Sequence, residues 1–394
     1  MKFHAAALST STAILAVFCT PAWAVDADDF ASKFFAMWDS SGIGTEYSVT
    51  AVGDDGVRIS GLTVTASDLE TPMEVPLSMN VFGITEDGNG GYRAESAQIE
   101  GFSFTEDDIS LSVGEITLSG IDVPATASYE TINDVPNIEV ISVGEITVDF
   151  EGQRVATLSG LEGTSMLDRQ TSIATVQYGL TRFEADLSGV DDEEAVTALA
   201  ALGLLSISGS SQTEATINYE TGLLDITENR FTIDDVGQLD MYGAFTGYDL
   251  ELASSMIRTQ QQVAKLPADA KDAAMMGMGV QLISKVGLAH FTIRFDDDSI
   301  SEKLIDLFAV QQGVDRATLG VMASAMIPAA MAEFNVPQLA KSVSKAVSDF
   351  IADPKSIEIG ARPENPVTPI ELMPFVESPE IIVDMLGVTV TANQ

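Results

Sequence analysis

Hydrophobic and polar residues alternate with a period of two over much of the first half of the chain. From Glu46 to about Val190, short alternating runs are separated by turn segments such as "GDDG" at 53–56 and "EDGNGG" at 86–91. A period of two is typical of strands that bury one face, and the turns separate neighbouring strands. We therefore predict a curved, mostly antiparallel, β-rich region here.

One short helix is predicted ahead of these strands, from Asp28 to Asp39. Phe30, Phe34, Met37 and Trp38 fall at offsets of 0, 4, 7 and 8 residues, which places them on one side of a helix. We interpret this aromatic stripe as a face that docks on the sheet.

The hexapeptide "SVGEIT" occurs twice, at 112–117 and 142–147. In both copies the alternation slips by one residue at the Gly-Glu step. A strand that keeps one face buried accommodates a slip by a bulge or a bend, and glycine permits the local conformation. We therefore expect Gly114 and Gly144 to be structural residues in long, bulged or bent strands. Similar punctuation, "SGL" or "SGI", stands at 60–62, 119–121 and 159–161.

From Asp191 onward, helical and strand patterns mix. A helix at 191–205 and a β meander precede two helices on either side of Pro267, and strands "LAHFTIRF" and "LGVTVTAN" stand among further helices. One of these helices is expected to bury the stripe Ile300, Leu304, Leu307 and Phe308. The uncharged stretch Ala317–Ala332 is short for a membrane span and is predicted to be a buried helix. The predicted fold class is α+β, with a mixed helical and β C-terminal part.

The N-terminal residues predict export. Lys2 precedes an apolar run from Ala5 to Cys19, and "PAWA" offers a cleavage site after Ala24, as in a secretory signal peptide. We expect a periplasmic protein whose mature chain has neither a cysteine nor a transmembrane segment. The predicted division is a signal peptide (1–24), a β-rich domain with a short helix (25–190) and an α+β part (191–394). Whether the last two form one unit stays open.

The charge balance is strongly acidic, with 59 Asp and Glu against 19 Lys and Arg and a formal net charge of −40. Nucleic acid is excluded as a partner because phosphate binding needs a basic surface. A solvated acidic surface explains the composition, and attraction of cations or of a basic envelope protein is the alternative.

Few residues offer catalytic chemistry, and no cofactor or metal site is predicted. His290 lacks a second imidazole or a nucleophile elbow, and "SVSK" at Ser342–Lys345 lacks the partner motifs of serine acyl-enzymes. Glu115 and Glu145 could form a carboxylate pair, but acidic residues beside a bulge glycine are common. Four methionines are either core filling or a pliable lining for apolar cargo: Met275, Met276, Met322 and Met326.

Segments such as "FTIDDVGQLDMYGAFTGYDLE", "FTIRFDDDSISEKLIDLFAVQQGV" and "FIADPKSIEI" resemble an uncharacterised family of exported alphaproteobacterial proteins. The "SVGEIT…SGL" strands are also loosely similar to the repetitive β segments of AsmA-like envelope proteins. The first resemblance implies no activity, and the second implies a curved β groove associated with lipid transfer.

These observations favour a non-enzymatic protein that binds or shields an apolar, lipid-like envelope molecule, or that acts as an envelope scaffold. An acidic interaction module for a basic protein or for cations is the alternative. A hydrolase of unknown substrate is the third hypothesis.

Overall fold

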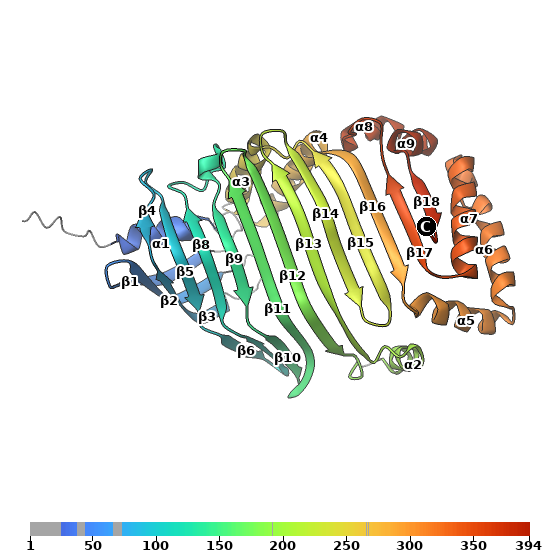
Figure 1. Cartoon of the computed structure of the whole chain (residues 1–394), viewed down its shortest axis with the longest axis horizontal. Coiled ribbons are helices and arrows are strands. Elements are labelled where there is room, and N and C mark those ends of the chain that lie inside the picture. Colours follow the sequence, from blue (N-terminus) through green and yellow to red (C-terminus); the bar gives the residue numbers. More distant parts are fainter. Residues whose placement is uncertain (1–24, 38–43, 66–72, 191, 265, 267) are drawn as a thin grey trace, which may run out of the picture.

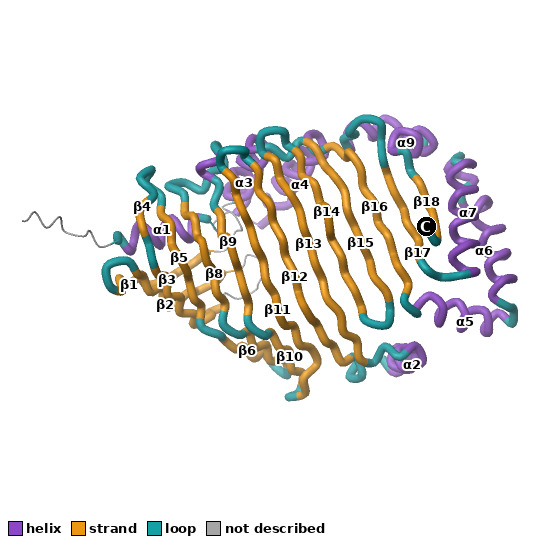
Figure 2. Tube along the Cα trace, viewed as in Figure 1, coloured by secondary structure: helices purple, strands orange, loops and turns teal. Residues whose placement is uncertain are grey.

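The computed structural model describes residues 25–37, 44–65, 73–190, 192–264, 266 and 268–394, and a single antiparallel sheet dominates it (Figures 1 and 2). The strands in the described residues are β1 (Gly44–Val52), β2 (Gly56–Thr65), β3 (Met73–Phe82), β4 (Thr85–Glu86), β5 (Tyr92–Ile99), β6 (Phe102–Glu106), β7 (Ile109–Val113), β8 (Ile116–Val123), β9 (Asn137–Val143), β10 (Ile146–Phe150), β11 (Gln153–Asp168), β12 (Ile173–Asp186), β13 (Ser206–Asn218), β14 (Leu223–Ile233), β15 (Gly237–Thr246), β16 (Gly287–Asp297), β17 (Ser356–Ala361) and β18 (Thr389–Ala392).

Residue pairing gives the order of the strands across the sheet as β1-β2-β3-β5-β8-β9-β11, and from β11 each strand pairs with the next as far as β18. β4 pairs with β5, and β6-β7-β10 forms a lower branch that joins β11. Several pairs contain register shifts, for example between Leu180 and Phe183. The sheet is continuous across residues 190 and 191, because β12 pairs with β13 along most of its length.

Helices lie mainly along the edges of the sheet rather than across its middle (Figures 1 and 2). This arrangement of strands and helices confirms the predicted fold class. The α-helices in the described residues are α1 (Ala27–Ala36), α2 (Glu193–Leu202), α3 (Leu250–Ala264), α4 (Ala268–Lys285), α5 (Ile300–Gln312), α6 (Arg316–Ala330), α7 (Pro337–Ala352), α8 (Pro369–Leu372) and α9 (Pro379–Leu386), and the 3-10 turns are η2 (Ile132–Asp134), η3 (Ala332–Phe334) and η4 (Met373–Phe375).

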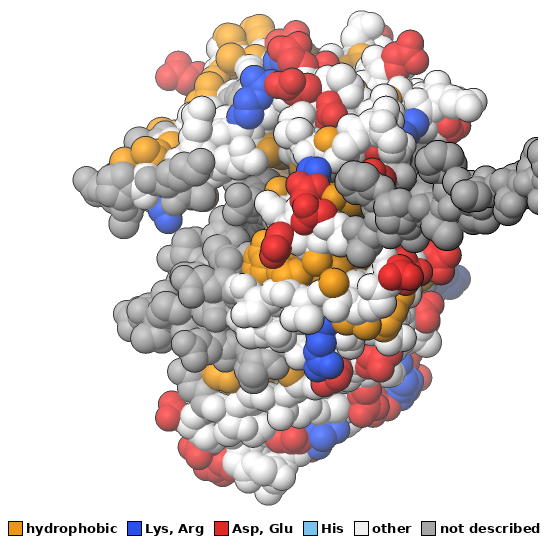
Figure 3. Space-filling model, turned by 90° about the vertical axis from the view of Figure 1, so that its left-hand side faces the viewer, with side chains coloured by type: hydrophobic (Ala, Val, Ile, Leu, Met, Phe, Trp, Pro, Cys, Tyr) orange, Lys and Arg blue, Asp and Glu red, His pale blue; other side chains and the backbone are white. Residues whose placement is uncertain are grey.

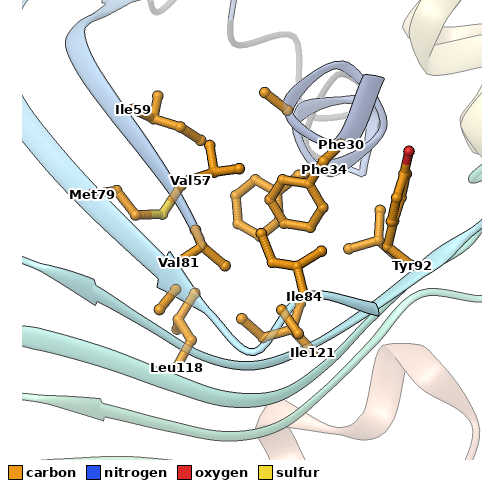
Figure 4. Packing of buried hydrophobic residues seen from close by; sticks show 14 residues of the cluster. Phe30, Phe34, Val57, Ile59, Met79, Val81, Ile84, Tyr92, Leu118 and Ile121 are labelled. Atoms are coloured by element: carbon orange, nitrogen blue, oxygen red, sulfur yellow. The ribbon is translucent and has the colours of Figure 1, made fainter. Parts of the chain in front are cut away.

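The predicted N-terminal helix is confirmed as α1. Asp26 caps it by accepting a hydrogen bond from the backbone N–H of Asp29 at 3.0 Å. Phe30 and Phe34 lie on its buried side and pack into the hollow formed by the first strands, as Figure 4 shows. Trp38, the last residue of the predicted stripe, lies outside the described residues.

The two "SVGEIT" copies pair with each other in antiparallel register. Val113 is opposite Ile146, and Ile116 is opposite Val143, so the register is kept across the Gly-Glu steps, where the strands are interrupted without a bulge. The N–H of Gly114 donates to the carbonyl of Glu145 at 2.9 Å, and the N–H of Gly144 donates to Glu115 at 2.8 Å.

Close backbone approach explains the two glycines. A Cβ atom on Gly114 would lie 2.9 Å from the Cα of Gly144, and a Cβ on Gly144 would lie 2.9 Å from the Cα of Gly114. Neither glycine has a positive φ. The "SGL" and "SGI" segments differ, because their glycines adopt the left-handed conformation that favours this residue: Gly61 at +69°, Gly120 at +61° and Gly160 at +66°.

The prediction of a buried helix at Ala317–Ala332 is wrong. α6 packs mainly along α7, where only the small Gly320 is buried and faces Ile351, and its opposite side is uncovered. Among the described residues, one helix, Arg316–Phe334, is long and apolar enough to cross a membrane, and 6% of its apolar window is buried.

The expected burial of the α5 stripe is wrong for a similar reason. Leu304, Leu307 and Phe308 are exposed, because the main contacts of α5 in the described residues are with α2 and α6 rather than with the sheet. α7 instead packs beside β18, which is the last strand of the sheet (Figure 1). It thereby covers an edge that could otherwise pair with another strand.

Candidate functional site

Directly paired residues define an apolar face that runs across the whole sheet, because opposite residues in a ladder point to the same side. One such row passes from β3 to β12 and has one residue on each of six strands: Val81, Ala97, Leu118, Ile141, Gly163 and Tyr178. Val81 and Ala97 are 0% exposed beneath α1, whereas Tyr178 is 52% exposed. The apolar face is thus covered at one end of the row and open at the other.

A second row extends the apolar face to the far edge of the sheet. It contains Leu161, Leu180, Ser211, Phe231, Leu239, Phe295, Ile357 and Ala392. Phe231 is 41% exposed, and Ile359, on the same side of β17, is 51% exposed. We call the part of this face on β11–β17 the open apolar face.

Aromatic side chains form part of the open apolar face. The rings of Phe183 and Phe231 stack at 5.4 Å between centroids, and Phe245 and Phe291 form a tilted pair at 6.3 Å. Such rings offer large apolar contact area to a ligand.

In Figure 3, hydrophobic side chains gather across the middle of the end of the molecule that carries β1, with acidic side chains above and below them.

The opposite side of the same strands is charged. Arg230 pairs with Asp240 at 2.9 Å, and Arg294 pairs with Asp296 at 2.6 Å. Arg294 also lies 3.6 Å from Glu358 on the neighbouring strand. These partly exposed ion pairs are solvated. One side of β14–β17 is therefore polar, and the other side is apolar.

Tyrosines and α3 close one end of the open apolar face. Leu252 of α3 is 0% exposed, and Tyr219 is 9% exposed. Burial raises the pKa of Tyr129, Tyr219 and Tyr248 above the ordinary tyrosine value, so all three are neutral at physiological pH. Figure 1 shows α3 and α4 beside the upper ends of β11–β15, while none of the helices in the described residues crosses the middle of these strands.

A cavity of about 340 Å³ marks the boundary between the covered and the open parts. Its apolar lining includes Met37, which follows α1, Ile138 and Ile141 of β9, and Tyr178 of β12. Tyr129, from the loop between β8 and β9, also belongs to the lining. The same loop is tied to α3, because Glu130 lies 3.6 Å from Arg258.

The residues considered for catalysis do not form a reactive group. The hydroxyl of Ser342 donates to the carbonyl of Gln338 at 3.2 Å, and Lys345 forms a close ion pair with Asp349. His290 lies on the charged side of β16, opposite Ala244. Within the described residues, no group of three or more His, Cys, Asp or Glu side chains could hold a metal ion.

The four candidate methionines lie on two peripheral helices and are all exposed. Met275 and Met276 of α4 are 55% and 73% exposed, and Met322 and Met326 of α6 are 45% and 68% exposed. None of them lines the cavity beside Tyr178. Their role as a cargo lining stays a prediction.

Sequence reasoning did not single out Tyr178, Phe231 or Ile359 as site residues. Their signal was the alternation itself, which places each of them among apolar residues of its strand. Nothing in that pattern says whether another element covers them, so they were indistinguishable from core residues.

Comparison with known proteins adds a family match but no function. Residues 230–393 match the model of a family described as "Uncharacterized protein". This segment begins at the end of β14 and includes β15–β18 and α3–α9. It therefore contains part of the open apolar face but not α1 or the strands that α1 covers. No curated protein matches the chain.

Proposed function

We propose that the protein binds or shields an acyl chain of a lipid-like envelope molecule on the open apolar face. The supporting observation is the exposure of Tyr178, Phe231 and Ile359 on a face whose equivalent positions beneath α1 are buried. Contiguous apolar patches larger than a few hundred Å² are uncommon on soluble monomers and mark interaction sites. Burial of an acyl chain contributes about 25 cal/mol per Å² of apolar surface.

The proposed role is non-enzymatic and periplasmic. It follows the predicted signal peptide, and the engagement of Ser342 and Lys345 with other partners supports binding rather than catalysis. It also agrees with the loose similarity to AsmA-like β segments, since a curved sheet with one apolar side is a suitable cradle for an alkyl chain.

Uptake of a fluorescent fatty acid tests this proposal. We expect saturable binding, and Phe231→Glu should weaken it at least about tenfold, equal to about 1.4 kcal/mol, because it places a charge on the apolar face. Leu223→Glu is the matched control. Leu223 lies on the same strand, points to the charged side and is 37% exposed, against 41% for Phe231.

Equal binding by the wild type and Phe231→Glu would contradict the location of the site. Absence of saturable uptake by the wild type would contradict the proposal itself. In that case an acidic module for a basic protein becomes the stronger hypothesis. Its best location is the polar cavity of about 960 Å³ whose lining includes Glu86, Asp87, Asp134 and Asp168, with Arg93 and Arg169 beside them.

A further inference from the structure

The outward side of α6 is an uncharged apolar stripe. Thr318, Val321, Met322, Ala325, Met326 and Ala329 are all exposed and recur at helical spacing. Val321 is 66% exposed and Met326 is 68% exposed. The preceding helix adds a second stripe through Leu304, Leu307 and Phe308, which are 46%, 43% and 54% exposed.

These stripes are separate from the open apolar face. α6 packs along α7, and α7 in turn packs beside β18, so α5 and α6 extend beyond the C-terminal edge of the sheet (Figure 1). An occupant of α6 therefore needs to contact a protruding helical surface rather than fill a groove in the sheet.

Local charge distinguishes this surface from the rest of the molecule. The chain carries a net charge of −40, yet residues 317–332 contain no charged residue. A shallow groove of about 730 Å³ between α6 and α7 brings Val321 and Ala325 together with Lys341 and with Lys345, which is paired with Asp349 in the same lining. Apolar side chains bordered by lysines are typical of helices that lie at a membrane interface, where the lysine stems extend toward the headgroups.

Electrostatics argue against a second copy of the chain as the occupant. Two copies that each carry a charge of −40 repel each other, and a dimer would have to overcome this over its whole surface. A zwitterionic bilayer imposes no such cost. The Arg316–Phe334 segment also has the length and hydropathy of a membrane helix. Only 6% of its apolar window is buried, whereas the apolar window of a core helix would be mostly buried.

We infer that α5 and α6 form a membrane-docking surface, with the outward stripe of α6 lying in the interface of a lipid bilayer. α6 does not span the bilayer. Its other side stays packed on α7, and its 15 α-helical residues are followed by the 3-10 turn η3 rather than by a continuous α-helical span. Docking at this edge places the open apolar face next to a source or a recipient of lipid.

Flotation of the mature protein with phosphatidylcholine vesicles tests the inference. We expect the wild type to float and the double variant V321E/M326E to lose at least about 90% of vesicle binding, because both charges would enter the apolar interface. The matched control is M166E/V376E. Met166 of β11 is 68% exposed and Val376, which follows η4, is 67% exposed, and neither belongs to α5 or α6, so this variant should float like the wild type.

Salt gives an independent check. Docking by apolar burial should persist in 1 M NaCl, whereas attachment through surface charges would be lost at about this ionic strength. Release of the wild type by salt, failure of the wild type to float, or equal loss in the control variant would each overturn the inference. So would a wild-type dimer, seen by sedimentation, that V321E/M326E dissociates.

The membrane-docking inference and the proposed acyl-chain site can be contradicted independently of each other. V321E/M326E should still take up fluorescent fatty acid in solution, because its substitutions are distant from Phe231. Phe231→Glu should still float with vesicles. Loss of flotation alone contradicts membrane docking, and loss of wild-type acyl uptake alone contradicts the proposed cargo site.

Discussion

The two ends of the sheet use the same alternation of apolar and polar residues but differ in what lies against the apolar side. At the N-terminal end, α1 places Phe30 and Phe34 over Val57, Ile59 and Val81, which are at most 1% exposed (Figure 4). At the other end, no helix of the part of the chain that the structure describes crosses the middle of this face on β12–β17 (Figure 1). The difference indicates that α1 completes a core, whereas the open apolar face stays accessible, and this accessibility is the basis of the proposed acyl-chain site.

The largest predicted difference in stability is between substitution of Phe30 in the covered core and substitution of Phe231 on the open apolar face. Phe30→Ala should reduce the free energy of unfolding by about 3–5 kcal/mol, because it leaves a cavity in a fully buried cluster. Phe231→Ala should cost about 1 kcal/mol, since the side chain is already 41% exposed and loses mainly its stacking on Phe183. Urea unfolding measures both. Similar losses for the two variants would mean that the open apolar face is packed like a core.

Substitution of either paired glycine, Gly114 or Gly144, should reduce stability by a smaller amount. Gly114→Val or Gly144→Val should cost about 1–3 kcal/mol, because the new side chain would meet the backbone of the other strand. Gly189→Val is the control, since nothing lies within 4 Å of a Cβ there and its φ is not positive. Thermal melts that treat all three variants alike would contradict the close approach.

The pH effect that Asp29 contributes at the covered end should be smaller still. Hydrogen bonds from Lys33 and Tyr92 lower the pKa of Asp29, linking α1 to β5. Because the folded pKa is below the unfolded one, the stabilisation is complete above the unfolded value near 4 and is lost as pH falls through the lowered pKa. Asp29 is partly exposed, so the contribution should be at most about 1 kcal/mol.

Urea unfolding at pH 7 and pH 3 measures this effect. Asp29→Asn should reduce stability at pH 7 and make it less dependent on pH than in the wild type. Asp28→Asn is the control, because Asp28 shares the first turn of α1 and so has a similar interaction with the helix dipole. An Asp28→Asn variant with the same pH profile as Asp29→Asn would assign the effect to the dipole instead.

The residues considered for catalysis should have no effect on binding at all. His290→Ala, Ser342→Ala and Lys345→Ala should each leave fatty acid uptake and any cellular phenotype unchanged, because none lies on the open apolar face. Folding of each variant is checked by its melt. A folded variant with a null phenotype would overturn the non-enzymatic proposal.

Local patterns in the sequence were sufficient to predict α1, the β meander and the α+β class, since each depends on periodicity within one segment. Non-local information was missing. The pairing of Gly114 with Gly144 depends on the register of two strands thirty residues apart, which a repeat alone does not define. The same limit explains the errors in α5 and α6, where an apolar stripe predicted a buried side that the fold leaves uncovered.

Native mass spectrometry of protein purified gently from its own envelope, together with lipid extraction, tests the central claim most directly. An open apolar face that holds an acyl chain predicts a mass above that of the mature chain, with the excess removed by organic extraction and identified as lipid. The Phe231→Glu variant, purified in the same way, should show mostly the bare mass. A bare mass for the wild type, with no lipid in the extract and no uptake of added fatty acid, would contradict the account.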